Sequence, residues 1–71
     1  MKVRKNKSYV YKPCLGDMCS PTTTAIRNLA SGSVVTVVHP HGCPPPNTMG
    51  MCHIADGEGR FLGLVYTASL H

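Results

Sequence analysis

The chain has 71 residues, of which 42% are hydrophobic, 14% are charged and none is tryptophan, and its formal net charge is +4. This length predicts a single domain over residues 1–71 with a small core, and the ordinary apolar content excludes an intrinsically disordered chain. No apolar run approaches the roughly 20 residues that span a bilayer, and the basic start lacks the apolar region of a secretory signal. We therefore expect a cytoplasmic protein with no membrane partner, in a compartment where thiols stay reduced.

Basic residues gather at the beginning of the chain. Five of the seven lysines and arginines are within the first twelve positions, namely Lys2, Arg4, Lys5, Lys7 and Lys12. Residues 3–11 alternate as a strand, with Tyr9 and Tyr11 on one face. We predict that these seven residues form a binding surface, either for the phosphates of nucleic acid or for a protein partner. The alternative is structural, because lysines also protect an exposed sheet edge from pairing with another chain.

The middle of the chain is rich in turn residues and ends in a clear strand. Residues 13–24 form a loop. Residues 24–29 are compatible with a short helix or with a strand, because the three threonines at residues 22–24 favour extended structure and residues 25–29 favour a helix. Residues 34–38 hold four valines and one threonine. Since β-branched side chains fit strands better than helices, residues 32–38 are predicted to form a strand with contacts on both faces.

A proline-rich loop and a hairpin follow this strand. Four prolines among residues 40–46 remove backbone donors and predict a stiff, ordered loop. Asp56-Gly57, between two apolar runs, predicts a hairpin that joins residues 51–55 to residues 60–66. Residues 67–70 are predicted to form a short turn that returns Leu70 to the core.

This order of elements, together with two glycine-led stretches, resembles a small barrel of the Src-homology-3 type. The stretches are Gly32-Ser33-Val34-Val35-Thr36-Val37-Val38 and Gly63-Leu64-Val65-Tyr66-Thr67-Ala68-Ser69-Leu70. The resemblance implies an all-β barrel of about five short strands with long loops and a short helical turn. It also implies that five side chains point inward, those of Val35, Val37, Ile54, Val65 and Leu70.

The resemblance does not extend to the peptide groove of that family. The family holds polyproline helices with a proline, a tyrosine and a tryptophan. Here Tyr66 occupies the position of the proline, Ser69 that of the tyrosine, and the chain has no tryptophan. We therefore do not expect proline-rich peptides as ligands, and a shared fold alone assigns no function.

The four cysteines have three interpretations that the sequence leaves open. Zinc prefers thiolates and imidazoles, usually from close pairs, whereas the spacings here are C-x4-C and C-x8-C. If the two long loops meet at one end of a barrel, a structural zinc would be held by Cys14, Cys19, Cys43 and His41. The other interpretations are free thiols that serve as small apolar residues, or disulfides in an oxidising compartment.

The sequence contains no convincing arrangement of catalytic residues. Cys52 and His53 are adjacent, so a strand would point them to opposite faces. Cys43 has histidines nearby in the loop, but no third group to orient them as a base. The chain has only three acidic residues, and two of them belong to the predicted hairpin turn. We expect no enzyme.

From the sequence, we expect a small non-catalytic binding or adaptor module that contacts nucleic acid through its basic N-terminal strand. The alternative is a homo-oligomeric interaction or structural protein, with or without the zinc site. Its homodimer would form by pairing of exposed sheet edges.

Overall fold

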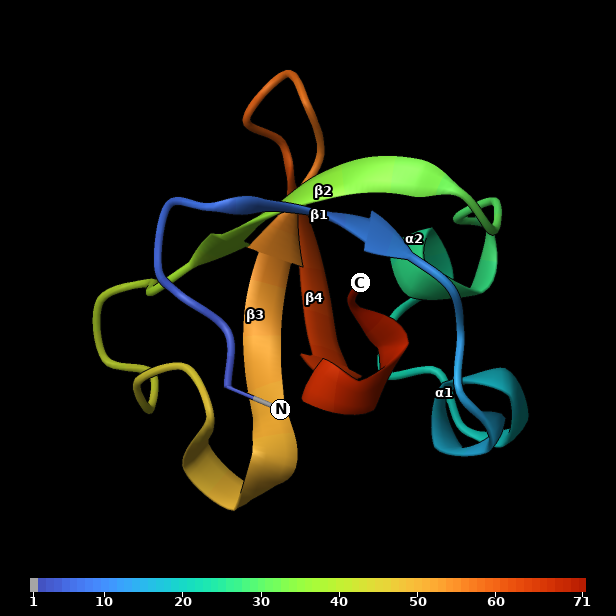
Figure 1. The fold of residues 1–71 in the computed structure, drawn as a ribbon, viewed down its shortest axis with the longest axis horizontal. Helices are drawn as coiled ribbons and strands as arrows, with labels where there is room; N and C mark the ends of the chain where they lie inside the picture. Colours follow the sequence, from blue (N-terminus) through green and yellow to red (C-terminus); the bar gives the residue numbers. More distant parts are fainter. Residues whose placement is uncertain (1) are drawn as a thin grey trace.

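The strands of this chain pair in the order in which they occur in the sequence. The computed structural model describes residues 2–71 and holds one antiparallel sheet in the order β1-β2-β3-β4 (Figure 1). The strands are β1 (Ser8–Tyr11), β2 (Ser33–Val38), β3 (Met51–Ala55) and β4 (Phe61–Tyr66). The helices are all short: α1 (Leu15–Cys19), α2 (Thr24–Arg27), η1 (Thr48–Gly50) and η2 (Thr67–Ser69). The predicted all-β class is confirmed in this coarse form.

The valine-rich strand β2 lies at the centre of the core, as predicted. Its side chains alternate, so Val35 and Val37 are fully buried while Val34 is 58% exposed. Val35 pairs with Tyr9 on one side, and Val37 pairs with Ile54 on the other. The five side chains that were expected to point inward are all buried, which confirms that prediction.

The hairpin between β3 and β4 is also confirmed. One carboxylate oxygen of Asp56 accepts the backbone N–H groups of Glu58 at 2.9 Å and of Arg60 at 2.8 Å. Gly59 completes the turn with a φ of +85°, a conformation that glycine adopts without steric cost. Asp56 is therefore a turn residue, as the sequence indicated.

The first strand is shorter than predicted, because residues 4–7 form a turn and β1 begins only at Ser8. The Lys7 N–H donates to the Arg4 carbonyl at 3.3 Å, and Asn6 has a positive φ of 66°. Asparagine tolerates this conformation better than most residues with a side chain. Val3, before the turn, is nevertheless buried in the core.

The loop between β1 and β2 contains two helices. The open question about residues 24–29 resolves as helix α2, which covers Thr24–Arg27. The Thr23 hydroxyl caps this helix by accepting the Ile26 N–H at 3.1 Å. Ile26 carries this segment into the core. Helix α1 precedes it in a stretch that was expected to be loop only. Among residues 2–71, no helix is long and apolar enough to cross a membrane.

The end of the described chain returns to β1. Leu70 is fully buried after η2 and forms an isolated antiparallel bridge with Tyr11. Val10 and His71 exchange two backbone hydrogen bonds, of 2.8 and 3.0 Å. The short turn that returns Leu70 to the core is confirmed. Four strands and this bridge take the place of the predicted five strands, and the fifth strand is not confirmed.

The edge formed by β4 is occupied by polar side chains of the β1–β2 loop. The Thr23 hydroxyl donates to the Leu62 carbonyl at 2.7 Å, and the Thr22 hydroxyl donates to the Leu64 carbonyl at 2.6 Å. The next edge donor, Tyr66 N–H, donates to the carboxylate of Asp17 at 3.2 Å. Together with the contact of His71 on β1, these bonds leave little of either sheet edge for pairing with another strand.

Candidate functional site

The five basic residues near the start of the chain are all exposed. We call residues 2–12 the basic segment. Its acidic counterparts lie elsewhere, since Asp17 is a buried residue of α1, and Asp56 and Glu58 belong to the β3–β4 hairpin. The basic segment therefore presents positive charge without a carboxylate of its own, which is the electrostatic pattern of an anion-binding surface.

Backbone hydrogen bonds hold the basic segment against the sheet. The Asn6 N–H donates to the Val37 carbonyl at 2.7 Å, and the Val37 N–H donates to the Lys7 carbonyl at 3.0 Å. The Arg4 N–H donates to the hydroxyl of Tyr9 at 2.9 Å. The cations of this turn thus project from a fixed backbone rather than from a free tail.

Asn47 in the β2–β3 loop fastens the beginning of the segment. Its amide oxygen accepts the Val3 N–H at 2.7 Å, and its amide nitrogen donates to the Val3 carbonyl at 2.9 Å. Asn47 does so from a left-handed conformation with a φ of 75°. Nothing in the sequence pattern had singled out this residue, since the contact joins positions 44 residues apart.

Tyr9 and Tyr11 belong to the core and not to the surface. Their side chains are only 8% and 1% exposed, so the structure removes both rings from the predicted contact surface. Burial raises the pKa of Tyr11 above its ordinary value, and the nearby Asp17 and Cys14 add to that rise. The ring of Tyr9 still interacts with one of the basic residues, because the ammonium of Lys7 lies 5.6 Å from its centroid.

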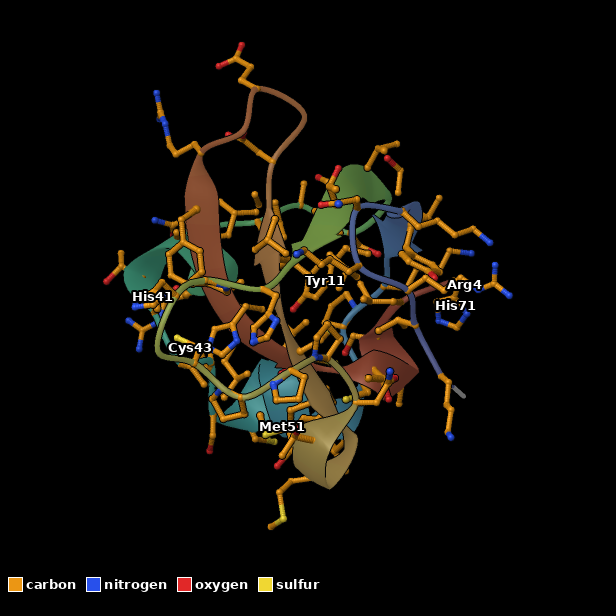
Figure 2. All side chains as sticks on the ribbon, turned by 90° about the vertical axis from the view of Figure 1, so that its left-hand side faces the viewer. Arg4, Tyr11, His41, Cys43, Met51 and His71 are labelled. Carbon is orange, nitrogen blue, oxygen red and sulfur yellow. The ribbon has the colours of Figure 1, made fainter. Side chains whose placement is uncertain are left out.

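The predicted zinc ligands are spread over two loops. Cys14 precedes α1 and Cys19 is its last residue, whereas His41 and Cys43 lie on the β2–β3 loop, on the opposite side of the molecule from Arg4 (Figure 2). Within residues 2–71, no group of three or more His, Cys, Asp or Glu side chains is arranged to hold a metal ion. All four cysteines are free thiols. A zinc site remains a prediction without such an arrangement to support it.

In the β2–β3 loop, the side chain of His39 contacts the backbone of Cys43. The ring nitrogen Nε2 of His39 lies 2.9 Å from the Cys43 carbonyl oxygen. On β3, Cys52 is buried and His53 is half-buried on the opposite face, as the alternation of a strand requires. Burial, with a further contribution from Asp17, raises the pKa of the Cys52 thiol to about 11.

A buried carboxylate is the main feature that the sequence did not reveal. Asp17 is 3% exposed and accepts hydrogen bonds from the Ser69 hydroxyl and from Tyr66 N–H. The thiol of Cys14 donates to the same carboxylate at 3.8 Å, and the Cys14 N–H donates to Ser69 Oγ at 3.0 Å. This cluster joins α1 to η2, and only long-range contacts create it.

Gly16 allows α1 to pack closely against the end of β4. A Cβ atom at this position would lie 2.7 Å from Cε2 of the Tyr66 ring. The ring therefore packs directly on the backbone of α1. The sequence shows only that Gly16 precedes Asp17 between two cysteines, and this local pattern does not predict the contact with Tyr66.

An apolar cavity of about 210 Å³ lies between the proline-rich loop and the β3–β4 hairpin. Its walls come from Pro44 and Pro45 on one side and from Met51, His53 and Leu64 on the other. Met51 projects from the lower end of the sheet, below the loop that carries Cys43 (Figure 2). Methionine and leucine side chains usually pack in the core. The sequence pattern alone therefore did not show that these residues line a cavity.

Comparison with protein families, with curated proteins and with solved structures finds no match to this chain. Functional inference therefore rests on the residues described above, and no family membership is assigned.

Proposed function

We propose that this chain is a small non-catalytic binding module whose basic segment holds the phosphate backbone of nucleic acid. The observation that carries the proposal is the combination of five exposed cations with an anchored backbone. Cations on an ordered turn lose less conformational entropy on binding than cations on a free tail. Their contacts to phosphates supply affinity that does not depend on base sequence.

The mode of recognition follows from what surrounds these cations. Proteins that prefer single strands stack bases on exposed aromatic rings. The two rings of the basic segment, Tyr9 and Tyr11, are buried, and the exposed rings of Phe61 and Tyr66 belong to β4. We therefore expect contacts to the backbone of a duplex without base stacking and without sequence preference.

We further propose that the sheet closes as a small barrel of the Src-homology-3 type. The bridge between Tyr11 and Leu70 and the backbone bonds between Val10 and His71 support this finer description. We do not expect this chain to share the proline-peptide groove of that family, because Ser69 is fully buried and bonded to Asp17.

The buried thiol of Cys52 supports a non-catalytic role. Cys52 has a raised pKa of about 11, which leaves it protonated near neutral pH, and the thiolate is the nucleophilic form. The buried carboxylate of Asp17 already accepts hydrogen bonds from Tyr66 N–H and from the Ser69 hydroxyl.

The test uses charge-matched variants and a fluorescent 20-base-pair duplex of mixed sequence. Lys5→Gln/Lys7→Gln removes two cations of the turn, whereas Arg27→Gln/Arg60→Gln removes two exposed cations outside the basic segment. We expect the first pair to weaken duplex binding about tenfold at low salt, because each cation neutralises roughly one phosphate. The second pair should change affinity less than twofold.

Equal losses in both double variants would overturn the proposal, since binding would then follow net charge and not this surface. Unchanged affinity in Lys5→Gln/Lys7→Gln would do the same. Thermal melting of each variant verifies that the fold is intact.

A further inference from the structure

Three side chains with metal-binding atoms line the same apolar cavity. Met49, Met51 and His53 are among the walls of the cavity of about 210 Å³ next to the proline-rich loop. Thioether sulfur is a soft ligand that selects Cu(I), and imidazole nitrogen binds copper as well. We call these three residues the soft cluster.

The geometry of β3 holds two of the three side chains on one face. Met51 and His53 are two residues apart on this strand, so their side chains point to the same face and their Cα atoms are roughly 6.6 Å apart. Their cross-strand partners are Tyr66 and Leu64 of β4. Long side chains at this separation can reach a single ion between them.

The imidazole of His53 is packed against another ring, but its nitrogens are free. The ring stacks on that of Phe61, with centroids 5.9 Å apart and an interplanar angle of 28°. Within residues 2–71, Nε2 of His39 lies 2.9 Å from the Cys43 carbonyl oxygen, whereas no hydrogen bond engages a ring nitrogen of His53. No fully buried side-chain nitrogen lacks a partner in this part of the chain, so the nitrogens of His53 are accessible to a ligand.

Met49 has a backbone conformation that residues of its type rarely adopt. Its φ is +58°, in the left-handed region, and its side chain is 88% exposed at the rim of the cavity. This region is unfavourable for a residue with a long side chain, and such conformations are concentrated at functional sites. The next residue, Gly50, adopts the same region without steric cost. A ligand for the thioether would give the exposed Met49 side chain a role.

The charge of the cavity selects the kind of ion. Among the described residues that line it, none carries a carboxylate. Cys52 also lines the cavity, but it belongs to the core cluster, on the face of β3 opposite to Met51 and His53. Structural zinc sites usually include thiolates, and calcium sites include carboxylates. Because a monovalent ion costs less to bury among neutral ligands than a divalent one, the soft cluster favours Cu(I).

We propose that the soft cluster binds one Cu(I) ion through the thioether sulfurs of Met49 and Met51 and a ring nitrogen of His53. β3 supplies two ligands from a regular strand, and Met49 supplies the third from the loop before it. This inference is independent of the nucleic-acid proposal, because none of the three residues belongs to the basic segment.

The test titrates Cu(I) into the reduced protein without oxygen, in competition with the chromophoric chelator bicinchoninate. We expect the wild type to bind one equivalent. Met49→Leu/Met51→Leu should weaken binding at least about tenfold, because leucine nearly matches the volume of methionine but has no donor atom. Met18→Leu is the matched control, since Met18 is 66% exposed on α1, outside the cavity, and its affinity should stay within about twofold of the wild type.

The thiols are the competing site, because all four cysteines are free and thiolates also bind Cu(I). Cys19→Ser/Cys43→Ser should retain one equivalent of Cu(I) with unchanged affinity. Carbon-13 NMR of methyl-labelled methionine gives a second measurement, in which one equivalent should shift the signals of Met49 and Met51 and leave that of Met18 in place.

Four results would overturn the proposal. The first is a wild type that binds no Cu(I) in the competition. The second is a Met49→Leu/Met51→Leu variant that binds as tightly as the wild type, and the third is an equal loss in Met18→Leu. The fourth is loss of binding in Cys19→Ser/Cys43→Ser, which would assign the ion to the thiols. Thermal melting of each variant verifies that the fold is intact.

Discussion

The two stretches on either side of Pro13 use charge in opposite ways. Residues 2–12 hold five cations, all exposed, and the hydrogen bonds that fix this stretch come from its backbone. Residues 13–32 hold the single carboxylate of the β1–β2 loop, Asp17, and that group is buried and fully engaged. The difference teaches which charges maintain the fold and which remain available for a ligand.

Asp17→Asn should have the largest effect on stability. The amide retains one acceptor but places two donors where the carboxylate received hydrogen bonds, so buried polar groups lose their partners. We expect the free energy of unfolding to fall by about 2–4 kcal/mol, measured by urea denaturation. Duplex affinity of the folded protein should stay within twofold of the wild type.

Glu58→Gln is the control, because Glu58 is an exposed acid in the hairpin. Its effect on stability should lie within about 0.5 kcal/mol. Equal losses in the two variants would show that the buried position of the Asp17 carboxylate does not matter.

Asn47→Gly should lower stability less than Asp17→Asn does, and it should also weaken duplex binding. Glycine accepts the positive φ of 75° without strain, so this change isolates the loss of the two side-chain bonds to Val3. We expect a loss of about 1–2 kcal/mol in stability. Duplex affinity should fall several-fold as the basic segment loosens, measured by fluorescence anisotropy. An unchanged affinity would mean that anchoring the segment contributes nothing to binding.

High pH should destabilise the protein through its buried thiol. The pKa of Cys52 is raised to about 11 in the folded state, so the unfolded chain loses its proton first and stability declines as pH rises from about 9 to 11. Burial raises the pKa of Tyr11 as well, which adds to the same trend. The expected loss is about 1–2 kcal/mol, measured by urea denaturation at pH 8 and pH 11.

Cys52→Ala tests the origin of that decline. The variant is less stable overall because it leaves a small cavity, but the decline between pH 9 and pH 11 should become shallower. A decline of unchanged size would assign the alkaline sensitivity to other groups. In the wild type, the exposed Cys19 should react quickly with a thiol reagent and Cys52 only after unfolding.

Lys5→Gln/Lys7→Gln should have the smallest effect on stability. Both side chains are exposed, so the free energy of unfolding should change by less than about 0.5 kcal/mol. A larger loss, seen in urea denaturation, would indicate that these lysines serve the fold and would remove the contrast with Asp17.

Local signals in the sequence were sufficient for much of the sheet. Adjacent β-branched residues predicted β2, and Asp56-Gly57 predicted the hairpin, because both depend on neighbours along the chain. The bonds of Asp17 to Tyr66 and Ser69 join residues 49 and 52 positions apart, so no local pattern contains them. Tyr9 and Tyr11 were correctly placed on one face, but alternation does not say which face is buried.

The dependence of duplex binding on salt tests the central claim most directly. If the five cations of the basic segment contact phosphates, a plot of log K against log salt should be linear with a slope of about −4 to −4.5. Lys5→Gln/Lys7→Gln should reduce the steepness by about 2, and Arg27→Gln/Arg60→Gln should leave it unchanged. A slope near zero, or no duplex binding at low salt, would contradict the account.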